Sequence, residues 1–228
     1  MLTKSFVVAA VLAVGLAGSL SATTVGLWST GVCSGLNVNL AQCQGAAGSQ
    51  LNYGVTDNNY VFSGFSTTNL TEHAVSTYIA DGTGSEWLTP GSVTAANFGS
   101  GTYTVTTTFN LTGFNASTLT LFLDIAADND VVAALNGTTI LSCGNGVNAG
   151  SACFTAFTSN HNINAGSIAL AGVNTLTFTV TNETNPSPTA LRVQVQGNAT
   201  LSTVPEPGTW ALLGAGLVAL GLLRRKLA

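Results

Sequence analysis

Residues 174–182, NTLTFTVTN, alternate apolar and polar side chains from end to end. In an extended chain, Leu176, Phe178 and Val180 would share one face and threonines would occupy the other. This period of two is typical of a β-strand that buries one face and exposes hydroxyl groups on the other. The stretch at 103–111, YTVTTTFNL, repeats the pattern, so the sequence predicts a protein built from half-buried strands.

Further strand-like segments follow along the chain, separated by turn residues. They are 117–127 (STLTLFLDIAA), 131–141 (VVAALNGTTIL), 154–159 (FTAFTS) and 190–201 (ALRVQVQGNATL). The first is apolar enough for a strand covered on both faces, and the last places Leu191, Val193 and Val195 on one face. Asn136-Gly137 predicts a hairpin, because both positions tolerate positive φ. At least seven short strands indicate an antiparallel β-sandwich.

The first third of this body is less regular. GLWSTGV (26–32) and NNYVFSGF (58–65) are predicted strands, and TEHAVSTYI (71–79) fits either a strand or a short helix. No shift in composition marks a domain boundary inside the body. The clearest linker is STVPEPG (202–208), which precedes the C-terminal tail.

Four cysteines are spaced in two equal pairs. Cys33 and Cys43 are ten residues apart, and so are Cys143 and Cys153. An even number of cysteines predicts disulfides for a chain that leaves the reducing cytosol. We favour Cys33–Cys43 and Cys143–Cys153 among the three connectivities, each closing a loop rich in Gly and Asn and contributing ~3 kcal/mol. A zinc site would need more closely spaced ligand pairs.

The charged residues are few and unevenly placed. The whole chain carries five Lys and Arg against nine Asp and Glu, a net charge of −4. Between residues 23 and 203, Arg192 is the one base against eight acids, which gives −7. A single cation cannot neutralise a row of phosphates, so nucleic-acid binding is excluded and anionic membrane surfaces are unfavourable partners.

Both ends of the chain have the pattern of targeting segments. Residues 1–22 have one basic residue, Lys4, near the start, then an apolar run, and small residues at the end. This order predicts a secretory signal peptide. At the other end, a proline–glutamate–proline triplet precedes fifteen uncharged residues and a basic cluster. Fifteen helical residues rise ~22 Å, less than the roughly 30 Å of a bilayer core. This length predicts a transient membrane anchor and not a permanent span. The tail residues of interest are Pro205, Glu206, Pro207, Arg224, Arg225 and Lys226.

This tail resembles the PEP-CTERM sorting signal on exported proteins of Gram-negative bacteria. The triplet, the short apolar stretch and the basic end occur in the same order at the C-terminus. The resemblance implies export across the inner membrane, transient anchoring there and recognition by exosortase. It also implies a place at the cell surface or in an exopolysaccharide or biofilm matrix. The chain would then comprise a signal peptide (1–22), a β-sandwich (23–203) and a sorting signal (204–228).

The body is similar to the galactose-binding-like β-sandwich that recurs in PEP-CTERM proteins. The resemblance rests on ordered fragments: STGV, DNNYVF, SEWLTPGS, GTYTVTTTFNLTGFNASTLTL, AADNDVVAALNGTTI, LAGVNTLTFTVTN and NPSPTALRVQVQG. It implies an all-β jelly-roll sandwich, flanked here by an N-terminal signal helix and a short C-terminal transmembrane helix. It also implies that the fold can serve as a carbohydrate-binding module and can hold a structural calcium ion.

Two groups of side chains are candidate ligand sites. Glu86 and Trp87 would place an acid beside an indole, and an exposed indole can stack on a sugar ring, although a tryptophan of the core is the alternative. Asp124, Asp128 and Asp130 are the densest acidic cluster and could offer oxygen ligands to calcium. Their alternative role is to end a strand and form a turn. Trp28 is a weaker aromatic candidate than Trp87.

The sequence shows no catalytic motif. His73 and His161 are its only histidines, and the chain has no H-E-x-x-H, no G-x-S-x-G and no phosphate-binding loop. Folding could still bring two carboxylates together for glycoside hydrolysis, which stays a minor alternative. The sequence therefore predicts a non-catalytic surface or matrix protein, with a carbohydrate-binding module for an extracellular polysaccharide as the second hypothesis.

Overall fold

The computed structural model describes residues 21–227 except 38, 65–68, 73–76, 83, 92–97, 145–151, 159–160, 184–186 and 203–208. The predicted signal peptide and His73 lie outside these residues, apart from the last two positions of the signal. The triplet Pro205, Glu206 and Pro207 lies outside them as well.

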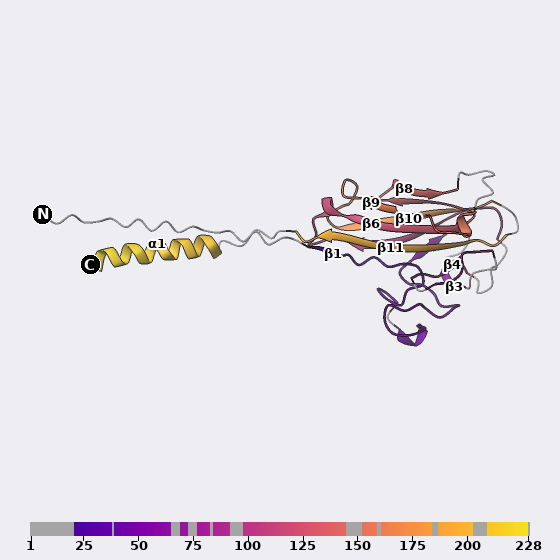
Figure 1. Ribbon diagram of the computed structural model, residues 1–228, viewed down its shortest axis with the longest axis horizontal. Coiled ribbons are helices and arrows are strands. Elements are labelled where there is room, and N and C mark those ends of the chain that lie inside the picture. The colour runs from indigo at the N-terminus through magenta and orange to yellow at the C-terminus, as the bar shows by residue number, and fades with distance from the viewer. Residues whose placement is uncertain are drawn as a thin grey trace.

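Two antiparallel sheets form the body (Figure 1). One has the strand order β3 (Asn69–Glu72), β4 (Trp87–Pro90), β11 (Ala190–Thr200), β6 (Thr120–Asp128) and β9 (His161–Asn164), with β1 (Ala22–Thr24) also paired to β11. The other has the order β2 (Val61–Ser63), β5 (Gly101–Asn110), β10 (Val173–Asn182), β7 (Asp130–Leu135) and β8 (Thr138–Cys143). Short 3-10 turns are η1 (Leu40–Gln42), η2 (Ala116–Thr118) and η3 (Ala152–Phe154). The prediction of an all-β protein with antiparallel strands is confirmed.

The core lies between the two sheets and uses the faces that the alternating patterns predict. Leu176, Phe178 and Val180 of β10 are completely buried, and Leu191 and Val193 of β11 join them from the other sheet. Each such side chain contributes roughly 1.5–3 kcal/mol through burial. The two long strands β10 and β11 therefore provide the facing halves of one core.

The predicted hairpin and the predicted buried strand are both present. Asn136 and Gly137 connect β7 to β8 with φ values of 50° and 84°, the left-handed conformation that this turn requires. Strand β6 is buried at every position from Leu123 to Asp128, so its second half is covered on both faces. The beginning of its predicted range forms η2 instead, because the Asn115 side chain caps that turn.

Of the two strands predicted in the N-terminal region, the one at 58–65 contains β2 and the one at 26–32 is absent. Residues 26–32 form no strand, and Val32 contributes only an isolated bridge to Gln50. A buried Asp57 carboxylate orders the region instead, accepting hydrogen bonds from Gly31 N at 2.7 Å and Asn37 Nδ2 at 2.8 Å. Hydrogen bonds from side chains to the backbone produce no periodic pattern in the sequence. The apolar pattern of residues 26–32 therefore predicted a strand that is absent.

Disulfides join Cys33 to Cys43 and Cys143 to Cys153. The first closes the irregular N-terminal region into a loop that lies beside β3 and β4 (Figure 1). The second joins the end of β8 to η3. The structure thus contains the pairing that the spacing favoured.

The tail forms a helix, α1 (Thr209–Leu227), which lies apart from the two sheets (Figure 1). Leu217, Val218 and Leu220 on this helix are exposed. Within the part of the chain that the structure describes, no helix has both the length and the hydropathy for a membrane span. The prediction of a C-terminal helix is therefore met, but this helix does not qualify as a membrane span. Its uncharged part ends before Arg224.

A buried asparagine on β10 joins two turns, the Asn136-Gly137 hairpin turn and the segment at 170–172. The Asn174 side chain accepts from Leu170 N at 2.7 Å and from Asn136 Nδ2 at 2.9 Å. It donates to Leu170 O at 2.8 Å and Gly172 O at 2.9 Å. Because Asn174 is completely buried, water cannot replace these four partners.

Replacing Asn174 with alanine should lower the free energy of unfolding by roughly 2–4 kcal/mol, because several buried backbone groups lose their partner. Urea denaturation of both proteins measures the change. Thr175→Ala, at the next position on β10, is the matched control and should cost less than ~1 kcal/mol. Equal losses for the two variants would contradict this account of the network.

Candidate binding groove and the buried polar layer behind it

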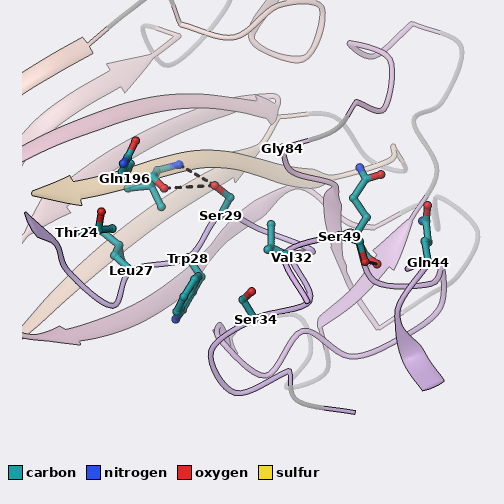
Figure 2. A pocket seen from close by; sticks show the side chains of 13 residues that line it. Thr24, Leu27, Trp28, Ser29, Val32, Ser34, Gln44, Ser49, Gly84 and Gln196 are labelled. Carbon is teal, nitrogen blue, oxygen red and sulfur yellow. Dashed lines mark hydrogen bonds between the residues drawn. The ribbon is translucent and has the colours of Figure 1, made fainter. Parts of the chain in front are cut away.

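A groove of about 510 Å³ lies between the N-terminal region and β11. Figure 2 shows its side chains extending from Thr24 and Leu27 at one end to Gln44 and Ser49 at the other. None of its lining residues is charged: they are Thr24, Leu27, Trp28, Ser29, Val32, Ser34, Gln44, Gly48, Ser49, Gln50, Gly84, Val195 and Gln196. The groove is therefore a neutral surface of hydroxyls, amides and a few apolar groups.

Trp28 is the aromatic residue of this groove and is 38% exposed. Its backbone oxygen accepts a 2.7 Å hydrogen bond from the buried Tyr60 hydroxyl, which fixes the chain at this point. The indole lies against Gly35, whose φ is +66° and where a Cβ would overlap both Trp28 Nε1 and Asn59 Oδ1. Only glycine suits Gly35, because it provides the left-handed backbone and the space for the indole.

Several polar side chains of the groove are held in place by the fold. Ser29 Oγ accepts from Val195 N at 3.0 Å, which ties the N-terminal region to β11 (Figure 2). Gln44 Nε2 donates to Leu51 O and to Glu86 Oε1, both at 2.8 Å. In contrast, Ser34 and Gln196 make no side-chain hydrogen bond within the described structure, so both are available to a ligand.

Behind Gln44 lies Glu86, a completely buried acid. Burial, reinforced by the negative charge of Asp81, raises the pKa of Glu86 from 4.5 to about 8, although Gln44 and Arg192 oppose the shift. Its Oε2 atom has no hydrogen-bond partner among the residues that are described. At neutral pH this side chain is therefore mainly a neutral carboxylic acid.

Arg192 is also buried, on the outer face of β11 rather than in the core. Its Nε donates to Ser85 Oγ at 2.9 Å and its Nη1 donates to Ala80 O at 2.7 Å. The guanidinium lies 5.0 Å from the centre of the Phe157 ring, a cation–π contact. Burial lowers the pKa of Arg192, and the negative charge of Asp81 counteracts this. The arginine thereby attaches the segment before β4 to the sheet.

The structure corrects the prediction that Glu86 and Trp87 contact a sugar. Trp87 is completely buried, its Nε1 donates to Ile79 O at 3.0 Å, and its ring centre lies 4.6 Å from that of Tyr78. It packs in a second cluster with Ala126 and Ala190, on the outer face of the first sheet. Because both side chains are completely buried, neither Glu86 nor Trp87 can reach a ligand from solvent.

The three aspartates predicted for calcium do not form one site. Asp124 lies on β6 four residues before Asp128, a separation of about 13 Å along a strand, too far to share an ion. Asp128 accepts a hydrogen bond from the Tyr78 hydroxyl, and burial raises its pKa. Asp128 ends β6 and Asp130 begins β7, so these two aspartates flank the point where the chain passes from one sheet to the other. In the described ranges, no group of three or more His, Cys, Asp or Glu is arranged to hold a metal.

Sequence reasoning missed most of the groove. Its residues come from the N-terminal region, from the first disulfide loop, from the segment before β4 and from β11. Ser34 and Gln196 are more than 160 positions apart and carry no motif. The one available signal was Trp28 itself, which the sequence placed below Trp87. His161 lies in β9.

The raised pKa of Glu86 predicts a pH-dependent stability. The folded protein holds this proton more tightly than the unfolded chain between pH 4.5 and about 8, so stability should fall as pH rises through that window. Glu86→Gln removes the titration and should be more stable than the wild type at pH 8.5, by on the order of 1–3 kcal/mol. At pH 5 the two should be similar. Thermal unfolding at both pH values tests this, and equal pH slopes would contradict it.

Trp87→Ala should lower the free energy of unfolding by about 3–5 kcal/mol, the typical cost of removing a large buried ring. Trp28→Ala serves as the matched control and should cost clearly less, because part of that indole is already exposed. Guanidinium denaturation of both variants provides the comparison. A smaller loss for Trp87→Ala than for Trp28→Ala would show that the two tryptophans are wrongly assigned.

Comparison with known proteins finds a family for the tail alone. Residues 203–226 match the model of the PEP-CTERM protein-sorting motif. No curated protein matches the chain significantly. The C-terminal segment that contains Arg224, Arg225 and Lys226 is therefore a PEP-CTERM sorting motif, which indicates an exported protein that exosortase processes.

Proposed function

We propose that this chain is a non-catalytic protein of the cell surface or of the exopolysaccharide or biofilm matrix of a Gram-negative bacterium. The sorting motif at residues 203–226 is the observation that carries the proposal. Exosortase is its processing partner, acting on the tail while the helix holds the chain at the inner membrane. We further propose that the sandwich is of the jelly-roll, galactose-binding-like type and that it works without a cofactor.

The environment of the acids supports a non-catalytic role. Glu86 has the shifted pKa that often marks a general acid, but buried structural networks produce the same shift. The carboxyl is completely buried and its Oε1 is already bonded to Gln44. Since a sugar cannot approach it, Glu86 does not support glycoside hydrolysis.

A carbohydrate-binding module is the second candidate function, and the neutral groove favours it. Sugars are bound by aromatic faces together with amides and hydroxyls, because their rings offer both C–H surfaces and hydroxyl groups. The groove contains the exposed Trp28 together with serine and glutamine side chains. A matrix protein and a glycan-binding protein are compatible roles, since binding would retain the protein in the matrix.

Intact mass of the protein recovered from cells and from medium tests the first proposal. We expect mature protein that lacks the signal peptide and the residues after the Pro205-Glu206-Pro207 triplet, with both disulfides oxidised. Replacing the three triplet residues by alanine should leave the tail in place, because exosortase would no longer recognise it. A matched control replaces Thr106, Thr108 and Asn110 of β5 by alanine and should be processed normally.

A surface-associated wild-type protein that retains residues 208–228 would contradict processing. Equal tail removal from the triplet variant and from the control would contradict recognition through the triplet. Both outcomes concern the tail and are independent of any glycan.

A further inference from the structure

We propose that the groove between Trp28 and β11 binds a segment of an uncharged polysaccharide, with Trp28 as the platform for one sugar ring. The inference rests on the second candidate function above and assigns its site and its class of ligand. It replaces the Glu86–Trp87 site that the sequence suggested.

The size and shape of the groove suit a short length of chain. Its volume of about 510 Å³ lies within the roughly 300–1,000 Å³ that is usual for ligand sites. The labelled side chains in Figure 2 extend from Thr24 and Leu27 past Trp28 and Val32 to Ser49 and Gln44. An elongated site of this kind has room for sugar units on both sides of the indole.

The charge of the site determines which polysaccharide it accepts. No lining residue is charged, and the segment 23–203 as a whole has a formal charge of −7. Uronate, sulfate or phosphate groups on a glycan would therefore meet no cation in the groove and would be repelled by the rest of the body. This excludes polyanions as the main ligand and leaves neutral sugars, whose hydroxyls and C–H faces need no counter-charge.

The polar groups are arranged for hydroxyl recognition. Ser34 and Gln196 have no side-chain partner within the described structure, so they can exchange water for sugar hydroxyls without breaking a bond of the fold. Ser29, Gln44 and Gln50 are each held by hydrogen bonds to backbone groups. Their fixed positions reduce the entropy lost on binding.

Affinity electrophoresis of the protein recovered from the exporting cells tests the inference. Native gels are cast with a neutral galactomannan, with a neutral xyloglucan, with the acidic alginate or with no polysaccharide. We expect at least one neutral polysaccharide to retard the wild type, and alginate to have no effect. Retardation by alginate alone, or by none of the three, would overturn the proposal.

Substitutions of groove residues test whether the polysaccharide binds in the groove. Trp28→Ala should weaken the retardation at least about tenfold, and Trp28→Phe should weaken it less, because a smaller ring still stacks. Gln196→Ala should weaken it severalfold. The matched controls are Val132→Ala and Thr108→Ala, two exposed positions on the other sheet, and both should bind as the wild type does.

Thermal unfolding shows whether each variant is folded, so that loss of binding is not confused with loss of structure. Wild-type retardation by folded Trp28→Ala, or an equal loss in Val132→Ala, would overturn the assignment to this groove. If no glycan bound, the loss of mass on removal of the tail would still be observed. Failure of this inference can therefore be distinguished from failure of the export proposal.

Discussion

Arg192 is the only cation between residues 23 and 203, and it lies buried on the outer face of β11. Most buried acids of the domain have no positive charge to pair with. Each must therefore accept hydrogen bonds from neutral donors or keep its carboxyl group protonated. Asp57 is stabilised by backbone and amide N–H donors, Asp128 by the Tyr78 hydroxyl, and Glu86 by retaining its proton near neutral pH. Burial raises the pKa of all three acids for the same reason. Scarcity of cations is thus consistent with the way in which these three acids are stabilised.

The same scarcity shapes the surface. A protein that does not rely on ion pairs must keep its polar surface in hydroxyls and amides, and the groove is built from these groups. Arg192 also helps to fix one lining residue of the groove, because it donates to Ala80 O and Ser85 Oγ, which lie before and after Gly84 in the chain. Gly84 in turn lies so close to the Gln194 amide that a Cβ there would contact it at 2.5 Å. The buried cation and the neutral groove are consequently parts of one arrangement on the outer side of β11.

Local patterns in the sequence predicted the central strands well and the ligand site poorly. The alternation in 174–182 identified the buried face of β10, and Asn136-Gly137 identified the β7–β8 hairpin, because both depend on neighbouring residues alone. Period two also separated Arg192 from the core face of β11, but it could not show that a distant loop covers the outer face. For that reason Trp87 seemed available to a sugar although Tyr78 and its neighbours bury it. The groove joins residues more than 160 positions apart, and only the tertiary fold brings them together.

The first disulfide lies beside the groove and fixes part of its wall. Cys33 and Cys43 are bonded, and the next residues, Ser34 and Gln44, both line the groove. Gln44 also donates a 2.8 Å hydrogen bond to the buried Glu86, so this loop contacts that acid directly. Disulfides form in oxidising compartments and not in the reducing cytosol. Under the export proposed above, the disulfide that holds Ser34 and Gln44 in the wall of the groove would form only after the chain has left the cytosol.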